Sequence, residues 1–285
     1  YQSKFILPFW IPGILVGVFL TVFCKNRIND FVTRHLEDKD KLGIVIASLL
    51  GALSPVTIYG MLPLIVLLAG TGIAQSVLIA FMITSILINP NLVIFTLALG
   101  LDIALLRLFF AIFAGITGGL IFEIFFREKD IFTFHNLDTK EKKGNVEKDY
   151  LIRFMKGCKK AFAKTAPNLM IGLLLSALFN KYFPMKFFTT LFAENRGLSV
   201  LFATSLGVPL YYCGGGTIPI INAWMHSGMG PGAVLGFMMA GPATKFTNLG
   251  AVKAVLKVKH FFFYLIYIMS FALFSGYLVD LILNL

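Results

Sequence analysis

One stretch in the second half of the sequence combines a thiol with a run of glycines. Residues 213–219 read Cys-Gly-Gly-Gly-Thr-Ile-Pro. Three glycines and a proline do not continue a helix comfortably, so backbone N–H and C=O groups are left without helical partners. These groups and the thiol are suited to holding a small solute. We therefore predict that four residues contribute to a binding site: Cys213, Gly214, Gly215 and Gly216.

The composition places this stretch in a membrane protein. Of the 285 residues, 58% are hydrophobic and only 14% are charged, which is too apolar for an ordinary soluble domain. Apolar runs near 20 residues fit helices that cross a hydrocarbon layer ~30 Å thick. The fold class we predict is therefore all-α, as a polytopic membrane protein. The net charge of +11 lies mostly between the apolar runs, which indicates membrane topology rather than nucleic-acid binding.

A basic region divides the chain into two similar halves. We predict a first membrane repeat over residues 1–126, a basic cytoplasmic loop with an amphipathic end over 127–164, and a second membrane repeat over 165–285. The loop carries eleven Lys and Arg residues against six Asp and Glu residues, as the positive-inside bias predicts. Each repeat holds about four apolar segments: Phe5 to Cys24, Leu42 to Gly70, Ile73 to Gly100, Leu101 to Phe126, Ala166 to Tyr182, Leu198 to Ser227, Met229 to Leu256, and His260 to Leu283.

A shift of the sequence by 156 positions aligns marked residues of the two halves. The matches include Gly51 with Gly207, Gly60 with Gly216, Pro63 with Pro219, and Gly72 with Gly228. Glycines and prolines mark backbone breaks, so these matches indicate a tandem duplication, a common plan among transporters. Whether the two copies are parallel or inverted is left open.

Both halves contain interrupted apolar segments, which read GALSPVTIYGMLP and LINPNLV in the first half, and GVPLYYCGGGTIP and AGPATKFTN in the second. Non-helical backbone is tolerated at membrane depth where protein or a water-filled cavity satisfies it. Paired helix ends would then form a polar site near the midplane. Each interruption could be a broken full span or a re-entrant helix, and the simpler alternative is a kink between packed helices.

The interruptions resemble the paired motifs of the predicted-permease family that includes the organoarsenical efflux permease ArsP. The matching residues are Ser54-Pro55, Pro63-Leu64 and Asn89-Pro90 in the first half, and Cys213, Gly216, Ile218-Pro219 and Gly241-Pro242-Ala243-Thr244 in the second. The resemblance covers nearly the whole chain and implies a permease with its site at these breaks.

The sequence departs from the family pattern at the cysteine pairs. Thr57 and Tyr59 stand where the first pair is expected, and Gly215 replaces the partner of Cys213. One sulfur with hydroxyl groups is a poorer ligand for a soft metalloid than two thiolates. The solute classes we consider are therefore a metalloid, a thiol-reactive species or a small anion.

Polar residues elsewhere in the apolar segments complete the predicted site. Asn89, Asn222, Lys245 and Asn248 join Thr57, Tyr59 and the 213–216 stretch as candidate solute ligands. Lys245 could bind an anion or titrate during proton coupling, and its alternative role is to extend to the membrane surface. Arg107 is expected to find a partner on another helix, because Asp102 lies five residues away rather than four.

The leading functional hypothesis is a multi-pass secondary transporter of the cell membrane. Its expected partners are the lipid bilayer, a small solute and a coupling ion such as the proton, with no nucleic acid, cofactor or metal site. The alternative is a channel with a filter lined by backbone carbonyls. An intramembrane enzyme using Cys213 and His226 is disfavoured, because no carboxylate is spaced to orient the histidine. The direction of transport and the oligomeric state are left open.

Overall fold

The computed structural model describes the helical parts of the chain in both halves. It covers residues 15, 18–19, 22, 40–54, 58, 61, 65, 68–69, 72–126, 131–132, 150–160, 162–163, 196–211, 217–218, 221–222, 224–225 and 228–283. Within these residues the regular secondary structure is helical, and one isolated β-bridge joins Phe132 to Leu256. The predicted all-α class is confirmed for this part of the chain.

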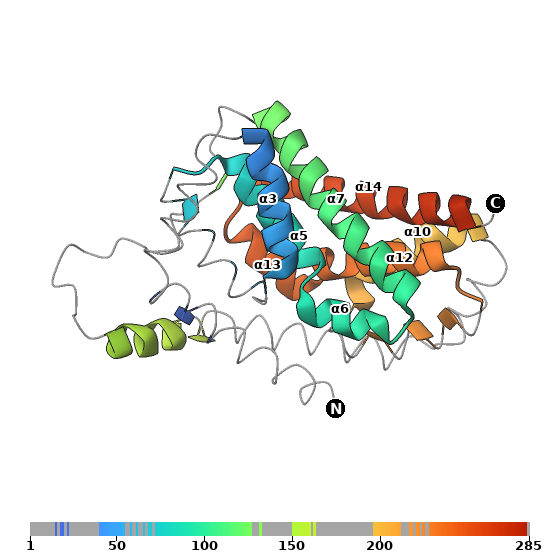
Figure 1. Cartoon of the computed structure of the whole chain (residues 1–285), viewed down its shortest axis with the longest axis horizontal. Helices are drawn as coiled ribbons and strands as arrows, with labels where there is room; N and C mark the ends of the chain where they lie inside the picture. Colours follow the sequence, from blue (N-terminus) through green and yellow to red (C-terminus); the bar gives the residue numbers. More distant parts are fainter. Residues whose placement is uncertain are drawn as a thin grey trace.

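Eight of the described helices fall into two series of four, and residues 150–160 form a further helix outside both series (Figure 1). The first series is α3 (Asp40–Leu53), α5 (Gln75–Leu87), α6 (Pro90–Leu97) and α7 (Leu101–Phe126). The second is α10 (Arg196–Leu210), α12 (Pro231–Thr244), α13 (Phe246–Lys253) and α14 (Val258–Leu283). Three helices of the second series begin 156 positions after their counterparts, as Asp40 and Arg196 illustrate, and α14 begins 157 positions after α7.

The break between α5 and α6 follows from the Asn89-Pro90 pair. Pro90 has no N–H to donate and its ring disfavours a helical conformation at the preceding residue, so Asn89 is extended, with φ −152° and ψ 167°. The Asn89 side chain then accepts a hydrogen bond from the Leu92 N–H at 3.0 Å, which caps the start of α6. Proline at the first helical position suits this role. The interruption predicted from LINPNLV is therefore present.

The corresponding break between α12 and α13 falls at Lys245, which has φ −51° and ψ 134°. Phe246 takes the place of the proline found in the first half, and Pro242 lies inside the last turn of α12. Both helices before the breaks are preceded by a glycine of positive φ, Gly72 at 89° and Gly228 at 97°. Glycine adopts this left-handed conformation without a steric penalty, so the same turn leads into α5 and α12.

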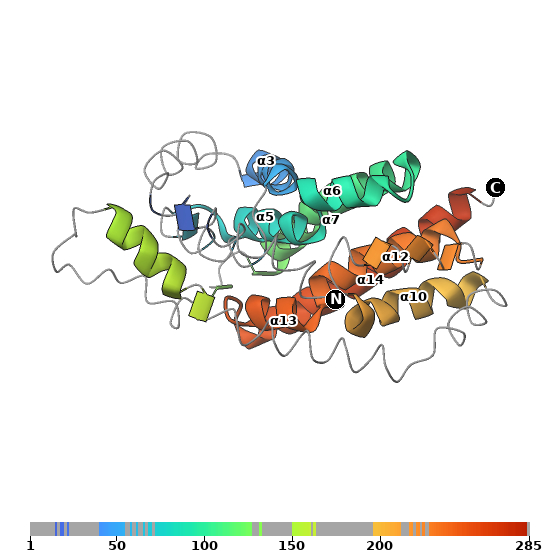
Figure 2. The same ribbon diagram turned by 90° about the horizontal axis from the view of Figure 1, so that it is seen from below.

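The two series pack in the same way within themselves. α3 and α7 both pack on α5, and α10 and α14 both pack on α12. Figure 2 shows the first series on one side of the molecule and the second on the other. A Cβ added to Gly51 would lie 2.8 Å from the Phe81 oxygen, and one added to Gly207 would lie 3.2 Å from the Phe237 oxygen. These contacts are 156 positions apart, and both glycines let neighbouring helices approach closely.

The second broken pair of helices, α12 and α13, lies along the long helix α14 that follows it. The N–H of Gly232, at the start of α12, donates to Asp280 Oδ1 at 2.9 Å near the end of α14. At the other end of α12, the carbonyl of Ala243 accepts from the Tyr264 hydroxyl, near the start of α14. The segment from α12 through α13 is therefore antiparallel to α14. Asp280 also places a negative charge at the N-terminus of α12, where the helix dipole favours it.

The two long helices cross each other in opposite directions. Thr117 contacts Tyr267 through their hydroxyl groups at 2.7 Å. Three ring pairs extend the contact along both helices, with residue numbers rising on α7 as they fall on α14: Phe113 with Phe271, Phe122 with Phe263, and Phe126 with His260. The crossing is therefore antiparallel and passes close to the middle of each helix.

α7 and α14 are the two helices of the described residues that are long and apolar enough to cross a membrane. Each has 26 residues, which corresponds to about 39 Å of helix. Both carry apolar side chains that the protein leaves uncovered: Leu101, Leu105, Phe109, Ile124 and Phe125 on α7, and Val258, Phe262, Ile266, Phe274, Leu281 and Ile282 on α14. Such a surface is suited to contact with lipid. Shorter apolar helices lie within α3, α5 and α10.

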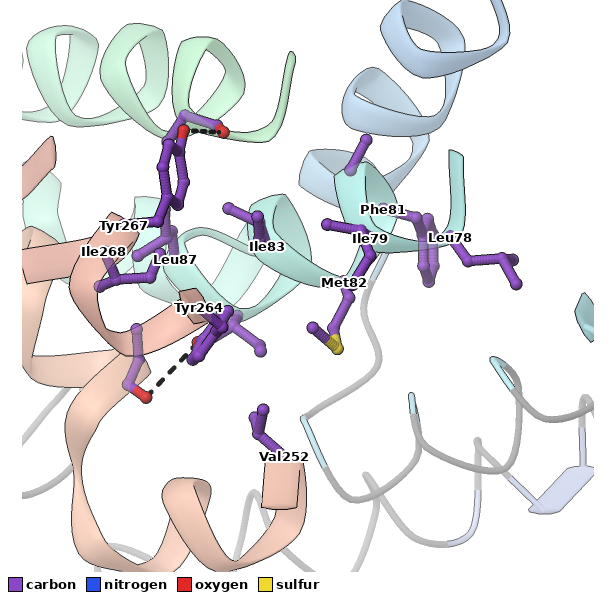
Figure 3. Close-up of a cluster of buried hydrophobic side chains, with 14 of the residues drawn as sticks. Leu78, Ile79, Phe81, Met82, Ile83, Leu87, Val252, Tyr264, Tyr267 and Ile268 are labelled. Atoms are coloured by element: carbon purple, nitrogen blue, oxygen red, sulfur yellow. Dashed lines mark hydrogen bonds between the residues drawn. The ribbon is translucent and has the colours of Figure 1, made fainter. Parts of the chain in front are cut away.

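One hydrophobic core joins the two series. In Figure 3, Leu78, Ile79, Met82 and Ile83 of α5 lie in a cluster that extends to Tyr264, Tyr267 and Ile268 of α14 and to Val252 of α13. The small residues Gly115, Gly118 and Gly119 on α7 are buried in the same region. The core therefore holds the break regions of both series in fixed positions.

Candidate functional site

The guanidinium group of Arg107 lies at the first break and is completely buried. It donates from Nη1 to the Thr96 hydroxyl at 2.7 Å and from Nη2 to the Leu87 carbonyl at 3.3 Å. Leu87 is the last residue of α5, so Arg107 satisfies a carbonyl that the break leaves without a helical partner. Nη2 also lies 3.4 Å from the Tyr211 hydroxyl oxygen, in the second half of the chain. The first break is thus connected directly to the second series of helices.

Tyr264 occupies the corresponding position in the second half, 157 residues after Arg107. Its hydroxyl donates to the carbonyl of Ala243 at 3.5 Å, in the last turn of α12. Ala243 is 156 positions after Leu87, so a side chain from the long helix caps the same carbonyl position at both breaks. The difference is the charge, because the first half uses a cation and the second half uses a neutral hydroxyl.

Tyr211 connects the two breaks. It follows α10 directly and is buried, with its hydroxyl at Arg107 and its ring against α12. A Cβ added to Gly241 would lie 2.7 Å from the Tyr211 Cβ, so the absence of a side chain at Gly241 makes room for the tyrosine. The Lys245 N–H donates to the Gly241 carbonyl at 3.0 Å. Tyr211 therefore lies between the guanidinium at one break and the last turn before the other.

The end of α12 has its carbonyl groups satisfied from several directions. Besides the bonds to Gly241 and Ala243, the Thr244 hydroxyl donates to the Ala240 carbonyl at 2.8 Å, and the Asn248 side chain donates to the Pro242 carbonyl. A continued helix would normally supply backbone donors to the Pro242 and Ala243 carbonyls, and here the side chains of Asn248 and Tyr264 take their place. This arrangement can hold non-helical backbone in an apolar surrounding.

The predicted ligands that the structure describes have different positions. Asn89 and Asn248 are half-buried, and each side chain bonds backbone at a break, Asn89 to Leu92 N–H and Asn248 to the Pro242 carbonyl. Lys245 is half-buried at the second break itself, where it separates α12 from α13. Asn222 is exposed. Three of the four therefore lie at the breaks, and their role as solute ligands stays a prediction.

The other predicted ligands lie outside the described residues. These are Thr57 and Tyr59 in the first half and Cys213, Gly214, Gly215 and Gly216 in the second. Their described neighbours bracket the second stretch, because Tyr211 precedes it and Thr217 and Ile218 follow it. All three of these neighbours are buried in the protein. Among the described residues, no group of three or more His, Cys, Asp or Glu side chains is suited to hold a metal ion.

Three residues of the site, Thr96, Arg107 and Tyr211, were missing from the predicted ligand set. The signal for Arg107 was a single basic residue inside an apolar segment, and the expectation of a partner on another helix is confirmed by Thr96, Leu87 and Tyr211. Thr96 gave no signal of its own, since a threonine in an apolar helix commonly bonds the backbone one turn earlier. It does so here, to the Leu92 carbonyl at 2.6 Å.

The sequence matches the family ArsP_1, described as predicted permease, over residues 1–281. It is 26% identical over 118 residues to the UPF0718 protein MJ0584 of Methanocaldococcus jannaschii. That match spans 41% of this chain and 32% of the relative, so it covers about a third of the relative's length. No solved structure matches.

Proposed function

Because the chain belongs to the predicted permease family and is therefore a membrane transport protein, we propose that it is a secondary transporter that moves a small solute. Its site is formed where the broken helices of the two halves meet. The observation that carries this proposal is the contact of Tyr211 with both breaks, through Arg107 on one side and Gly241 on the other. Helix ends that meet inside an apolar protein provide polar backbone for a solute at membrane depth.

We further propose that the two halves are inverted repeats in a multi-pass protein of the cell membrane. The helix bounds that recur at an offset of 156 or 157 residues support a duplication. The antiparallel crossing of α7 and α14 supports inversion, because equivalent helices of parallel repeats would cross the membrane in the same direction. An inverted pair can exchange conformations between its halves, which opens the site first to one side of the membrane and then to the other.

We propose that the interrupted segments are broken spans. α5 begins beside the later part of α7, where a Cβ added to Gly119 would lie 3.1 Å from the Ser76 oxygen. Three residues separate the end of α6 from the start of α7, and Arg107 bonds both α5 and α6. A re-entrant hairpin would bring the chain back to the side where it entered. The solute is a metalloid, a thiol-reactive species or a small anion, and a proton gradient is the proposed driving force.

Flux into proteoliposomes tests the transport function. Purified protein is reconstituted and uptake is measured for a panel of metalloids, thiol-reactive compounds and small anions, with and without a proton gradient. We expect saturable uptake that responds to the gradient. Uptake that never saturates would instead indicate a channel, and uptake no faster than in empty liposomes for every solute would contradict the proposal.

The variant Gly215→Leu tests where the site lies. A leucine in the predicted glycine site would fill the space that a bound solute needs, so we expect uptake to be abolished while the protein still inserts and purifies. Gly250→Leu is the matched control, because nothing lies within 4 Å of a Cβ added at Gly250. Normal uptake by Gly215→Leu would place the site elsewhere.

A further inference from the structure

Arg107 carries a charge that its surroundings in the described structure do not balance. The side chain is 0% exposed, and a guanidinium stays protonated in proteins. Its partners among the described residues are a hydroxyl, a backbone carbonyl and a tyrosine, all of them neutral. Buried charges are normally paired, because moving an ion out of water costs several kcal/mol even after relaxation.

The structural role of Arg107 does not require this charge. Tyr264 holds the equivalent carbonyl at the second break with a neutral hydroxyl. An arginine is therefore not needed to cap a helix end at this position. The positive charge at the first break is therefore available for a further interaction, and the interaction that favours a buried guanidinium most is with an anion.

The guanidinium also has donor capacity left over. Of its five N–H groups, three are used by Thr96, Leu87 and Tyr211, and its Nε has no partner among the described residues. The Tyr211 hydroxyl lies beside it, directly before the 212–216 stretch that contains the predicted glycine site.

We propose that Arg107 binds a small oxyanion, a solute with a carboxylate, phosphonate or phosphate group, and so selects an anionic substrate for transport. The inference rests on the proposed transport function and narrows it to one solute class. The guanidinium supplies the charge and the Nε–H donor, Thr96 and the Leu87 carbonyl hold its plane in position, and Tyr211 adds a hydroxyl from the other half. Because the anion would contact residues of both halves, its binding can change how the two halves pack against each other.

Thermal unfolding of the purified protein in detergent tests binding directly. The probes are sodium methylphosphonate and sodium acetate, with glycerol as the neutral probe and sodium chloride to match ionic strength. We expect the two oxyanions to raise the melting temperature of the wild-type protein in a concentration-dependent way, because a ligand that binds only the folded state stabilises it. Glycerol and chloride should have no such effect.

Four variants assign the effect to Arg107. Arg107→Gln removes the charge, and we expect the affinity for the oxyanions to fall about 10- to 100-fold, as loss of a charge-assisted hydrogen bond predicts. Arg107→Lys keeps the charge and should retain measurable binding, which provides a test if the glutamine variant does not fold. Arg153→Gln makes the same chemical change in the 150–160 helix and serves as the matched control. Tyr264→Phe removes the neutral cap and should lower stability without weakening oxyanion binding.

The results separate this inference from the proposed function. Equal stabilisation of wild type and Arg107→Gln, or equal effects of glycerol and oxyanions, would overturn the anion site. Stabilisation by vesicles containing phosphatidylglycerol without any response to the soluble oxyanions would also overturn it, because the group bound would then be a lipid headgroup. Saturable uptake of an uncharged solute that persists in Arg107→Gln would leave the permease proposal standing and refute the oxyanion selectivity. Arg107-dependent binding without uptake of any solute would refute transport alone.

Discussion

Asn89 and Pro90 together determine the end of one helix and the start of another. Proline alone would end α5, but it would leave the first N–H groups of α6 without acceptors. The Asn89 side chain supplies one acceptor, at 3.0 Å from the Leu92 nitrogen. The pair therefore gives an interrupted segment whose two ends are each stabilised by the local sequence.

Asn89→Ala should destabilise the protein because it removes this cap. We expect a loss of about 1 kcal/mol in the free energy of unfolding, the usual effect of removing an asparagine cap. Thermal unfolding in detergent measures it as a lower melting temperature. Asn89→Asp is the matched variant, because a carboxylate can accept the same bond, and it should restore most of the loss. An unchanged melting temperature in Asn89→Ala would show that the cap contributes nothing.

Cys158, in the 150–160 helix outside the two long helices, provides a pH-dependent prediction. Burial raises the pKa of the Cys158 thiol, because an apolar surrounding disfavours the charged thiolate. The thiolate is the reactive form, so the raised pKa lowers the reactive fraction at any pH below it. We expect maleimide labelling of native protein to be slower at pH 8 than labelling of the same protein in SDS, and to keep rising with pH above the ordinary range for cysteine.

The labelling is measured by mass shift in a protein whose other cysteines, Cys24 and Cys213, are replaced by serine. Labelling at the same rate in native and SDS-treated protein across this pH range would contradict the effect of burial on the thiol.

Glycines determine where two helices can pack closely against each other. Gly51 on α3 meets backbone of α5, since an added Cβ would lie 2.8 Å from the Phe81 oxygen and 3.2 Å from the Ser85 nitrogen. Backbone cannot move aside as a flexible side chain can, so the close packing of α3 on α5 depends on this glycine. Gly250 on α13 is the opposite case, with open space around it.

Replacing Gly51 by alanine and replacing Gly250 by alanine should change the free energy of unfolding in opposite directions. Gly51→Ala should destabilise by about 1–3 kcal/mol through overpacking, and Gly250→Ala should stabilise by roughly 0.5–1 kcal/mol through helix propensity. Comparison of the two melting temperatures with that of wild type checks both signs in one experiment. If Gly51→Ala were as stable as Gly250→Ala, the close contact of α3 with α5 would be wrong.

The sequence was sufficient to predict the elements where strong local signals occur. The bounds Leu101 to Phe126 were expected for an apolar segment and are those of α7, and Asn89-Pro90 predicted the first break. The segment AGPATKFTN predicted the second break, but the sequence offered no local reason for an extended conformation at Lys245 itself, because Phe246 rather than a proline follows it. The contact of Arg107 with Tyr211 joins residues 104 positions apart and could not be predicted, since it depends on how the helices pack.

In the whole molecule, the two halves are related by their packing and by the direction of their long helices. Corresponding helices pack on corresponding partners, and the long helices cross in opposite directions near their middles. Two equivalent spans that cross one bilayer in opposite directions must begin on opposite sides of it. Asp102 and Lys259 are equivalent residues near the starts of α7 and α14, and both are exposed.

Cysteine labelling at these two positions tests the central claim that the halves are oppositely oriented in one membrane. Asp102→Cys and Lys259→Cys are made separately in a protein whose three native cysteines are replaced by serine, and each is treated with a membrane-impermeant maleimide in right-side-out and inside-out vesicles. The account predicts that one position is labelled from one side of the membrane and the other position from the opposite side. Labelling of both positions from the same side would contradict it.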